Sequence, residues 1–315
     1  MGYALLFPGQ GSQSVGMAQD FVDAHPRARE TFEEADDVLG FELSSLCLEG
    51  PDDELQLTAN TQPAILTASI ALFRVLDAAA SGLAPLAVAG HSLGEYSAHV
   101  AAGSLDFADA LRLVRRRGQL MQEAVPVGTG AMAAVIGLDE APLRQLVEEV
   151  SGEGDGVVAV ANLNSPGQTV IAGHKGAVER AADRATASGA RLAKMLPVSA
   201  PFHSPLMAPA RAGLEPMLES TGFRDPEVPV VVNIDAAPVT SGGAARDARA
   251  RQIDGPVRWI ESIQAMRGDI GAEVFAEVGP GKVLTGLGKR IDRGATWMTS
   301  PAAAAVDAFV QQLTS

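Results

Sequence analysis

The sequence predicts an α/β protein in which a small ferredoxin-like domain is inserted into a larger domain. Short apolar runs alternate with longer segments of helical apolar spacing, and this alternation is typical of α/β folds. One internal segment follows a different order of strands and helices from the chain on either side of it. The chain has 315 residues, of which 47% are hydrophobic, so it is long enough for two domains and apolar enough to bury a core.

The first part of the chain supplies strands and helices of the larger domain. Residues 3–7 form an apolar run that stops at the loop PGQGSQ of residues 8–13, as expected of a buried strand. Pro63 stands near the start of a segment with helical spacing, where a proline is tolerated. The further elements that we expect are a helix at residues 63–80, a buried strand at 86–89, and helices at 95–102 and 106–124.

The segment 129–198 predicts the order βαββαβ, which is the ferredoxin-like arrangement. The expected elements are strands at residues 131–138, 157–162, 169–172 and 191–198, and helices at 141–150 and 176–189. We therefore assign residues 129–198 to a small domain, and residues 1–128 and 199–315 to a discontinuous large domain. The cleft between two such domains is a natural place for a binding site.

The α/β pattern resumes after residue 205. The expected elements are helices at residues 208–220 and 257–266, and strands at 228–233 and 274–278. Residues 241–251 are rich in Gly, Ala and Arg, and we interpret them as a loop with a weak helix.

Composition excludes several classes of function. A net charge of −14, from 38 acidic and 24 basic residues, argues against a surface for nucleic acid or anionic membrane. The single cysteine, Cys47, excludes an internal disulfide and a zinc site built from cysteines. The N-terminus lacks a basic region, and Arg74 and Asp77 interrupt the longest apolar stretch, so neither a signal peptide nor a membrane helix is expected. We expect a cytoplasmic protein.

Residues 90–94 read GHSLG and match the G-x-S-x-G pattern of a serine nucleophile at a sharp strand-to-helix turn. An expected strand precedes the pattern, and an expected helix follows it. Such a turn places the hydroxyl of Ser92 at a helix N-terminus, where the dipole favours developing negative charge. The alternative is a glycine-rich connection with an incidental serine, and the two flanking elements make it the weaker interpretation.

A serine nucleophile requires a general base, and the chain has five histidines. His203 lies between two prolines in the segment SAPFHSP of residues 199–205, where a stiff chain at the domain junction can hold an imidazole in place. His91 is adjacent to Ser92 and points away from it, and His99 lies about two helical turns below the hydroxyl. No carboxylate stands out as a partner for His203, so an acid and a backbone carbonyl both remain open as the group that fixes its tautomer.

Three consecutive arginines, residues 115–117, lie in an expected helix whose apolar stripe extends from Phe107 to Met121. At about 100° per residue, Arg116 lies opposite the stripe, whereas Arg117 lies only about 60° from its centre. A partly buried arginine needs an anion. The local sequence leaves a structural carboxylate and a substrate as even alternatives for that anion.

The chain resembles the malonyl-CoA:acyl-carrier-protein transacylases from Phe7 to about Arg290. An ordered series of motifs carries this resemblance, and a series is far more specific than G-x-S-x-G alone. The motifs are FPGQGSQ at residues 7–13, GHSLGEYSA at 90–98, RG at 117–118 with MQEAVP at 121–126, NSPGQ at 164–168, VSAPFHS at 198–204, Gln252 with PVRW at 256–259, and EVGPGKVL at 277–284. The resemblance implies a hydrolase-like parallel-sheet core with an inserted ferredoxin-like domain.

The resemblance also implies chemical roles. Ser92 would attack the malonyl thioester, and His203 would take the proton and later return it. The main-chain carbonyl of Gln252 would orient the imidazole, which would explain why no acidic partner stands out. The backbone N–H groups of Gln10 and Leu93 would form an oxyanion hole.

Three further side chains are implied to contact the substrate. Arg117 would bind the free malonyl carboxylate in a bidentate pair. In related acyltransferase domains, a phenylalanine at the position of Phe202 accompanies malonyl and a serine accompanies methylmalonyl. Discrimination over one methyl group is worth only about 1–3 kcal/mol, so Phe202 implies a preference. Gln62 would help to line the pocket, although it is almost equally well explained as a polar residue at a helix start.

The function implied is a ping-pong transfer of a malonyl group from malonyl-CoA to the phosphopantetheine thiol of an acyl carrier protein, through an acyl-Ser92 intermediate. No metal and no cofactor beyond these two thiol carriers is expected, and we expect a monomer. A carrier protein is typically acidic, as is this chain, so docking would need a local basic patch. The candidates are Arg184, Arg191 and Lys194, or Lys282, Lys289 and Arg290.

Two alternatives to this assignment stay open. In the first, the chain is a trans-acting acyltransferase of a polyketide synthase, with specificity for malonyl or another acyl group. In the second, it is a proofreading acyl hydrolase. A hydrolase uses the same nucleophile and base with water as the acceptor, but a cation beside the acyl tail has no use for neutral chains, so Arg117 disfavours it. A carrier-protein docking module without activity would have lost Ser92 or His203, and both are present.

Overall fold

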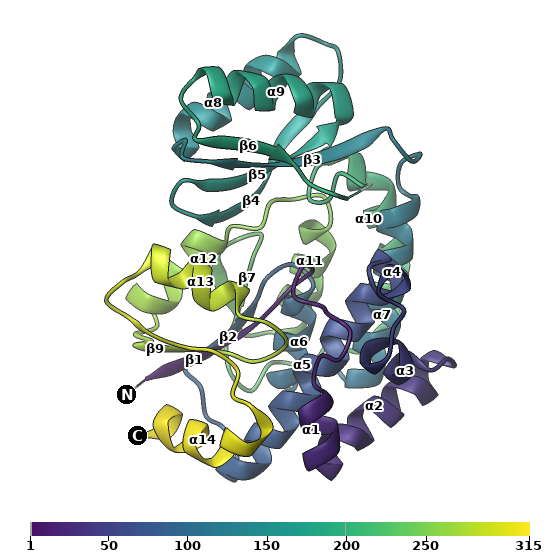
Figure 1. Ribbon diagram of the computed structural model, residues 1–315, viewed down its shortest axis with the longest axis vertical. Coiled ribbons are helices and arrows are strands. Elements are labelled where there is room, and N and C mark those ends of the chain that lie inside the picture. The colour runs from purple at the N-terminus through teal and green to yellow at the C-terminus, as the bar shows by residue number, and fades with distance from the viewer. Residues whose placement is uncertain (1, 199) are drawn as a thin grey trace.

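The computed structural model describes residues 2–198 and 200–315 and contains two sheets (Figure 1). The larger sheet has six strands in the order β10-β9-β1-β2-β7-β8. All neighbours in it are parallel except β7 and β8, which are antiparallel at one edge. The strands are β1 (Tyr3–Phe7), β2 (Ala87–Gly90), β7 (Val230–Val232), β8 (Ala237–Val239), β9 (Val274–Glu277) and β10 (Thr296–Met298). The predicted parallel-sheet core is confirmed.

Helices cover both faces of the larger sheet, so its central strands are buried on both sides. In β1, Leu5 and Phe7 belong to one hydrophobic cluster, and Ala4 and Leu6 belong to another on the opposite face. One face packs against α5 (Thr58–Ala80) and α6 (Gly94–Ala101), and α7 (Phe107–Glu123) packs in turn against these two helices. The other face packs against α12 (Trp259–Gly268) and α13 (Val283–Ile291).

The remaining helices lie around this core. Those before α5 are α1 (Gln19–Ala24), α2 (Pro26–Leu39), α3 (Leu43–Leu48) and α4 (Asp52–Leu55). Those in the second half of the larger domain are α10 (Ala208–Ser220), α11 (Gly242–Gln252) and α14 (Val306–Thr314), with short 3₁₀ helices at Pro205–Met207 and Ala303–Ala305. The sequence analysis did not anticipate α1 to α4.

The smaller sheet is antiparallel, with the strand order β4-β5-β3-β6. Its elements follow the chain as β3 (Gly130–Ile136), α8 (Glu140–Gly152), β4 (Val158–Ser165), β5 (Gln168–His174), α9 (Lys175–Ala187) and β6 (Leu192–Met195). This is the predicted ferredoxin-like order, with both helices on one face. The predicted domain boundary at residue 199 lies outside the described residues.

The two sheets are joined through the uncovered face of the smaller one. Met132 and Val170 point from that face into the hydrophobic cluster of the larger domain. The backbone of β4 also bonds to the segment before α12: Leu163 N–H donates to Val257 O at 2.9 Å, and Val257 N–H donates to Ala161 O at 2.8 Å. The smaller sheet is therefore connected to the larger domain by packing and by a short strand-like pairing.

Helix α5 begins at Thr58, before the predicted start at Pro63. Proline lacks the N–H that would bond to the carbonyl of Ala59 one turn earlier. The side chain of Arg115 replaces that donor, because its Nη1 donates to Ala59 O at 2.7 Å. A side chain from α7 thus lets the helix continue through a residue that usually marks a start.

The segment 241–251 was predicted as a loop with a weak helix, and the loop assignment is wrong. The residues form α11, which Ser241 caps by accepting a hydrogen bond from Ala244 N–H at 3.3 Å. Its buried positions recur at helical spacing at Ala245, Ala248, Arg249 and Gln252. Two of them are polar, so the apolar periodicity that would have revealed the helix is missing.

Helix α5 is long and apolar enough to cross a bilayer by length and composition alone. In this fold, 67% of its most apolar window is buried inside the protein, where it packs against α2, α7 and α14. It therefore serves as the central helix of the core.

The contact between α5 and α7 gives a prediction about stability. A methyl group on Gly118 would lie 2.7 Å from Thr58 O and 2.8 Å from Ala59 Cα, both of which are backbone atoms. We expect Gly118→Ala to lower the free energy of unfolding by about 1–3 kcal/mol through this overpacking. Chemical denaturation monitored by circular dichroism measures the change.

The matched control is Gly286→Ala in α13, where nothing lies within 4 Å of the added methyl group. Here we expect a gain of about 0.5–1 kcal/mol from the higher helix propensity of alanine. Equal effects of the two substitutions would contradict the close approach of α5 and α7.

Candidate active site

Ser92 lies at the sharp turn between β2 and α6, with a backbone φ of 53°. The turn depends on its two glycines. A Cβ at Gly90 would lie 2.0 Å from the carbonyl carbon of Gly94, and one at Gly94 would lie 2.1 Å from Phe7 O. Ser92 adopts the left-handed backbone conformation, and the two glycines avoid the clashes that a Cβ would cause. Together they form the nucleophile elbow that the sequence predicted.

His203 faces the serine hydroxyl. Its Nε2 lies 2.7 Å from Ser92 Oγ, while its Nδ1 lies 3.0 Å from Gln252 O and 3.1 Å from Gly255 O. Two carbonyl acceptors keep the proton on Nδ1, so Nε2 is left as the acceptor for the serine proton. Backbone carbonyls therefore fix the tautomer, and this settles the choice between an acid and a carbonyl that the sequence left open.

The environment of His203 keeps its imidazole neutral. Burial, followed by the positive charge of Arg117, lowers the pKa of His203 to about 3 from its ordinary value of 6.5. The side chain is only 4% exposed. At pH 7 the imidazole is thus unprotonated and able to accept a proton.

Arg117 reaches the elbow from α7 and is 2% exposed. Its Nη1 donates to Gln62 Oε1 at 2.9 Å, and its Nη2 donates to Ser92 Oγ and to Gln252 Oε1, each at 3.2 Å. Its buried Nε has no hydrogen-bond partner among the described residues. Since every partner is neutral, the charge of this guanidinium is uncompensated, and an anionic ligand is favoured over a structural carboxylate.

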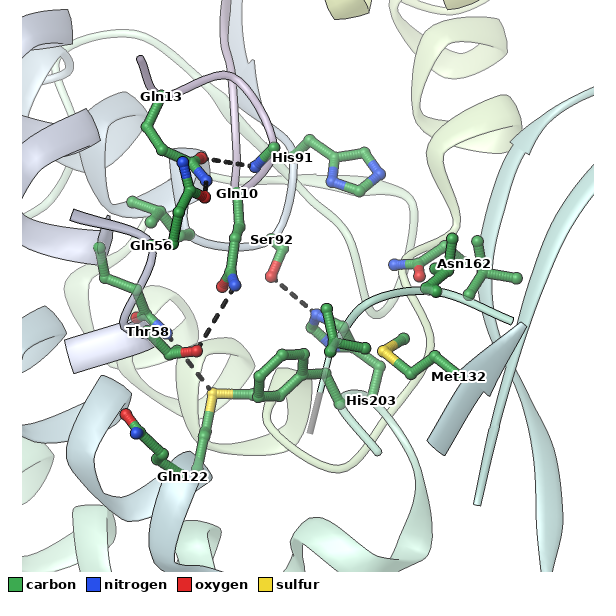
Figure 2. A pocket seen from close by; sticks show the side chains of 18 of the residues that line it. Gln10, Gln13, Gln56, Thr58, His91, Ser92, Gln122, Met132, Asn162 and His203 are labelled. Carbon is green, nitrogen blue, oxygen red and sulfur yellow. Dashed lines mark hydrogen bonds between the residues drawn. The ribbon is translucent and has the colours of Figure 1, made fainter. Parts of the chain in front are cut away.

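These groups open into a cavity of about 640 Å³ between the two sheets. Figure 2 shows Ser92 and His203 facing each other across part of it, with Gln10 and Thr58 bonded on another wall. The wall from the smaller sheet includes Met132, Asn162, Asn164 and Val170. The cavity therefore has a polar, cationic end at the elbow and a wall supplied by the small domain.

The other predicted residues also border this cavity. Gln10 follows β1 and Leu93 follows Ser92, and the backbone N–H of neither donates to a group in the described part of the chain. Gln62 is 1% exposed and is held by Arg117 and by a contact of its Nε2 with Met121 Sδ at 3.8 Å. Phe202 lines the cavity beside His203. The structure thus brings together all eight predicted site residues.

The remaining histidines have other partners. His91 Nε2 lies 2.8 Å from Asn164 Oδ1, so it contacts the smaller sheet. His99 Nδ1 lies 2.9 Å from Ser104 Oγ in the core. Within the described ranges, no group of three or more His, Cys, Asp or Glu residues could hold a metal ion.

Sequence analysis missed the residues that support the elbow from below. Asn233 Oδ1 accepts a hydrogen bond from Ser92 N–H at 2.8 Å, and Asn233 Nδ2 donates to Gly90 O at 2.8 Å. Glu95 and Arg249 form a fully buried ion pair nearby. The position of Asn233 at the end of a parallel strand was the one available signal, because the ends of neighbouring parallel strands meet at one edge.

The comparisons with known proteins agree on one family. The model of the acyl transferase domain matches residues 4–299. The malonyl CoA-acyl carrier protein transacylase of Escherichia coli K12 is 55% identical over 289 residues, which is 92% of each chain. The protein of the same name from Bacillus subtilis is 48% identical over 92% of this chain and 90% of its own.

Solved structures with these names also match. The malonyl CoA-acyl carrier protein transacylase of Coxiella burnetii superposes with a TM-score of 0.96 and 43% identity, over 100% of this chain and 98% of its own. A malonyl-transacylase in complex with a type II polyketide synthase acyl-carrier protein matches with a TM-score of 0.95 and 47% identity, over 99% of this chain and 100% of its own.

The environment of His203 gives a prediction about its titration. Since the pKa is lowered to about 3 in the folded chain, we expect the imidazole to stay neutral from pH 8 to below pH 5. The unfolded chain binds this proton near pH 6.5, so the free energy of unfolding falls as the pH drops below 6.5, by up to about 1.4 kcal/mol per pH unit from this group. Histidine titration by NMR and urea denaturation at several pH values measure both quantities.

The control is His203→Gln, which removes the titrating group and should flatten this part of the pH dependence of stability. A folded-state midpoint near pH 6.5, assigned to His203 by its absence from the variant, would contradict the prediction.

Proposed function

The chain belongs to the acyl transferase family of malonyl CoA-acyl carrier protein transacylases, and we propose that it transfers a malonyl group from malonyl-CoA to the phosphopantetheine thiol of an acyl carrier protein through an acyl-Ser92 intermediate. The observation that carries the assignment of the residues is the contact between Arg117 and the nucleophile. A buried, uncompensated guanidinium lies 3.2 Å from the serine hydroxyl. Malonyl carries a carboxylate one methylene group away from its thioester, so its two ends match these two groups.

The first half-reaction acylates the serine. His203 Nε2 takes the proton from Ser92 Oγ as the oxygen bonds to the thioester carbon. The backbone N–H groups of Gln10 and Leu93 stabilise the negative charge on the thioester oxygen. The C–S bond then breaks, His203 returns the proton to the leaving sulfur, and CoA departs as a thiol.

The second half-reaction runs through the same steps with a different thiol. The phosphopantetheine thiol gives its proton to His203 Nε2 as its sulfur bonds to the acyl carbon. The bond to Ser92 Oγ breaks, and the proton returns to that oxygen. One serine, one histidine and two backbone N–H groups therefore suffice, and we propose that the reaction needs no metal or further cofactor.

The selectivity for malonyl has two sources in this proposal. Arg117 favours an acyl group that ends in a carboxylate, and Gln62 holds the guanidinium in place through the 2.9 Å bond. Phe202 lines the cavity beside His203, where its ring would crowd a methyl group on the α-carbon. Since one methyl group changes binding by about 1–3 kcal/mol, Phe202 gives a preference for malonyl over methylmalonyl.

An acyl carrier protein is the acceptor, and we propose that it docks on basic side chains at the cavity rim. Lys194 lies two positions before Leu196, which lines the cavity. Lys282 follows Gly281, where an added Cβ would lie 3.5 Å from Ser12 Cβ of the loop after β1. Neither lysine forms an ion pair within the described residues, whereas Arg184 is paired with Glu153. Both candidate patches thus offer free charge, and Arg184 is the weakest member.

The pathway and the setting are also proposals. The similarity to a malonyl-transacylase in complex with a type II polyketide synthase acyl-carrier protein keeps a polyketide line open beside fatty-acid synthesis. The buried Arg117 argues against a proofreading hydrolase of neutral acyl chains. We propose a monomer in the cytoplasm, where the one free cysteine, Cys47, would stay reduced.

The role of Arg117 is tested by replacing it with alanine. We expect Arg117→Ala to lower malonyl loading of Ser92 by about two to three orders of magnitude, because the carboxylate loses its charged partner in a dry site. Loading from acetyl-CoA should stay the same or rise. Intact-protein mass spectrometry after mixing with each thioester measures the adducts.

Ser92→Ala is the control, since it should show no adduct with any thioester. Unchanged malonyl loading in Arg117→Ala would mean that the carboxylate is bound elsewhere, and equal malonyl and acetyl loading of the unmodified protein would remove the role of Arg117.

A further inference from the structure

We propose that Arg249 and Glu95 are positioning residues that keep Arg117 available to the substrate carboxylate. Arg249 pairs with Glu95, a buried carboxylate beneath the elbow, and so prevents it from neutralising Arg117. This inference rests on the proposed function of Arg117. It assigns a role in substrate selectivity to an ion pair that touches neither the substrate nor the reacting atoms.

The argument begins with the balance of buried charge. Arg249 and Glu95 are both 0% exposed and form an ion pair, and Arg117 is 2% exposed. These side chains carry two positive charges and one negative charge. Because Arg249 takes the negative charge, the remaining positive charge lies on Arg117 at the cavity.

A single amide separates the carboxylate from Arg117. Gln252 Nε2 donates to Glu95 Oε2 at 3.0 Å, while Gln252 Oε1 accepts from Arg117 Nη2 at 3.2 Å. Gln252 Nε2 also lies 3.0 Å from Ser92 O and from Asn233 Oδ1, so the amide has one orientation. The donor end of Gln252 therefore faces the anion, and its acceptor end faces the cation.

One aromatic ring also contacts both cations. The guanidinium carbon of Arg249 lies 5.4 Å from the ring centroid of Tyr96, and that of Arg117 lies 5.8 Å from it. The ring is fully buried next to Glu95 in the chain. The two arginines thus flank a common neighbour, so a change in charge at one is felt at the other through a medium of low dielectric.

The loss of Arg249 would leave Glu95 as a buried anion without its counter-ion, which is strongly unfavourable. The nearest remaining cation across Gln252 is Arg117. Its attraction to Glu95 would compete with its attraction to the malonyl carboxylate, and the negative charge would also repel that carboxylate. Acetyl, which has no carboxylate, would not be affected in this way.

The test compares malonyl-CoA with acetyl-CoA as donors to Ser92, by rapid quench and intact-protein mass spectrometry. We expect Arg249→Met, which keeps the aliphatic stem, to lower the ratio of malonyl to acetyl loading rates by about tenfold or more. Arg249→Lys keeps the charge and should hold the ratio within about threefold of the original value. The double variant Glu95→Gln with Arg249→Met removes both charges and should restore the ratio to the same range.

The matched control is Arg251→Met on the exposed side of α11, where Arg251 pairs with Asp235 and Asp247. It should leave the ratio unchanged. If Arg249→Met does not fold, Glu95→Gln carries the test, because removal of the negative charge should keep the ratio the same or raise it. A fall of the ratio in Glu95→Gln would overturn the proposal.

The outcomes separate this inference from the proposed function. Parallel losses of malonyl and acetyl loading in Arg249→Met, with the ratio unchanged, would show a structural role only and would overturn the inference. In that case the unmodified protein would still load malonyl on Ser92. Absence of malonyl loading in the unmodified protein would instead overturn the proposed function.

Discussion

The site depends on the buried positive charge of Arg117, which has no counter-ion in the part of the chain that the structure describes. A guanidinium in a dry cavity is costly unless an anion reaches it, and the neutral groups around Arg117 reduce that cost only in part. Gln62, Gln252 and Ser92 accept its hydrogen bonds and leave its net charge intact. Burial, followed by this same charge, lowers the pKa of His203 and keeps the neighbouring imidazole unprotonated. The charge of Arg117 therefore acts at both ends of the cavity: it favours an anion at the acyl-binding end, and it helps to keep the imidazole of His203 neutral at the other.

The fold provides this arrangement by bringing three segments to the carboxyl edge of the larger sheet. The turn after β2 carries Ser92, the end of α11 and the residues after it supply the carbonyls for His203, and α7 carries Arg117. The close approach of α7 to the start of α5, which Gly118 permits, places Gln62 beside the guanidinium. Packing of helices far from the chemistry thus sets distances at the elbow.

The sequence predicted the elements whose residues follow a simple rule. Alternating apolar runs located the strands, and the glycines around Ser92 located the elbow. Helical spacing placed Arg117 near the apolar stripe, but only the resemblance to a family gave it a ligand. Helix α11 was missed because Arg249 and Gln252 are buried polar residues whose partners come from other segments. Such long-range pairs leave no trace in local periodicity, and neither does the donor that Arg115 supplies to α5 beside Pro63.

The pairing of β4 with the residues around Val257 has a consequence for how a long thiol arm reaches the serine. Val257, which pairs with the smaller sheet, lies two residues after Gly255, whose carbonyl is one of the two acceptors for the Nδ1–H of His203. A hinge motion of the ferredoxin-like unit would pull on that segment and tilt the ring of His203. The cavity between the two sheets is therefore better suited to a flexible ligand that enters between two fixed domains than to closure of one domain over the ligand.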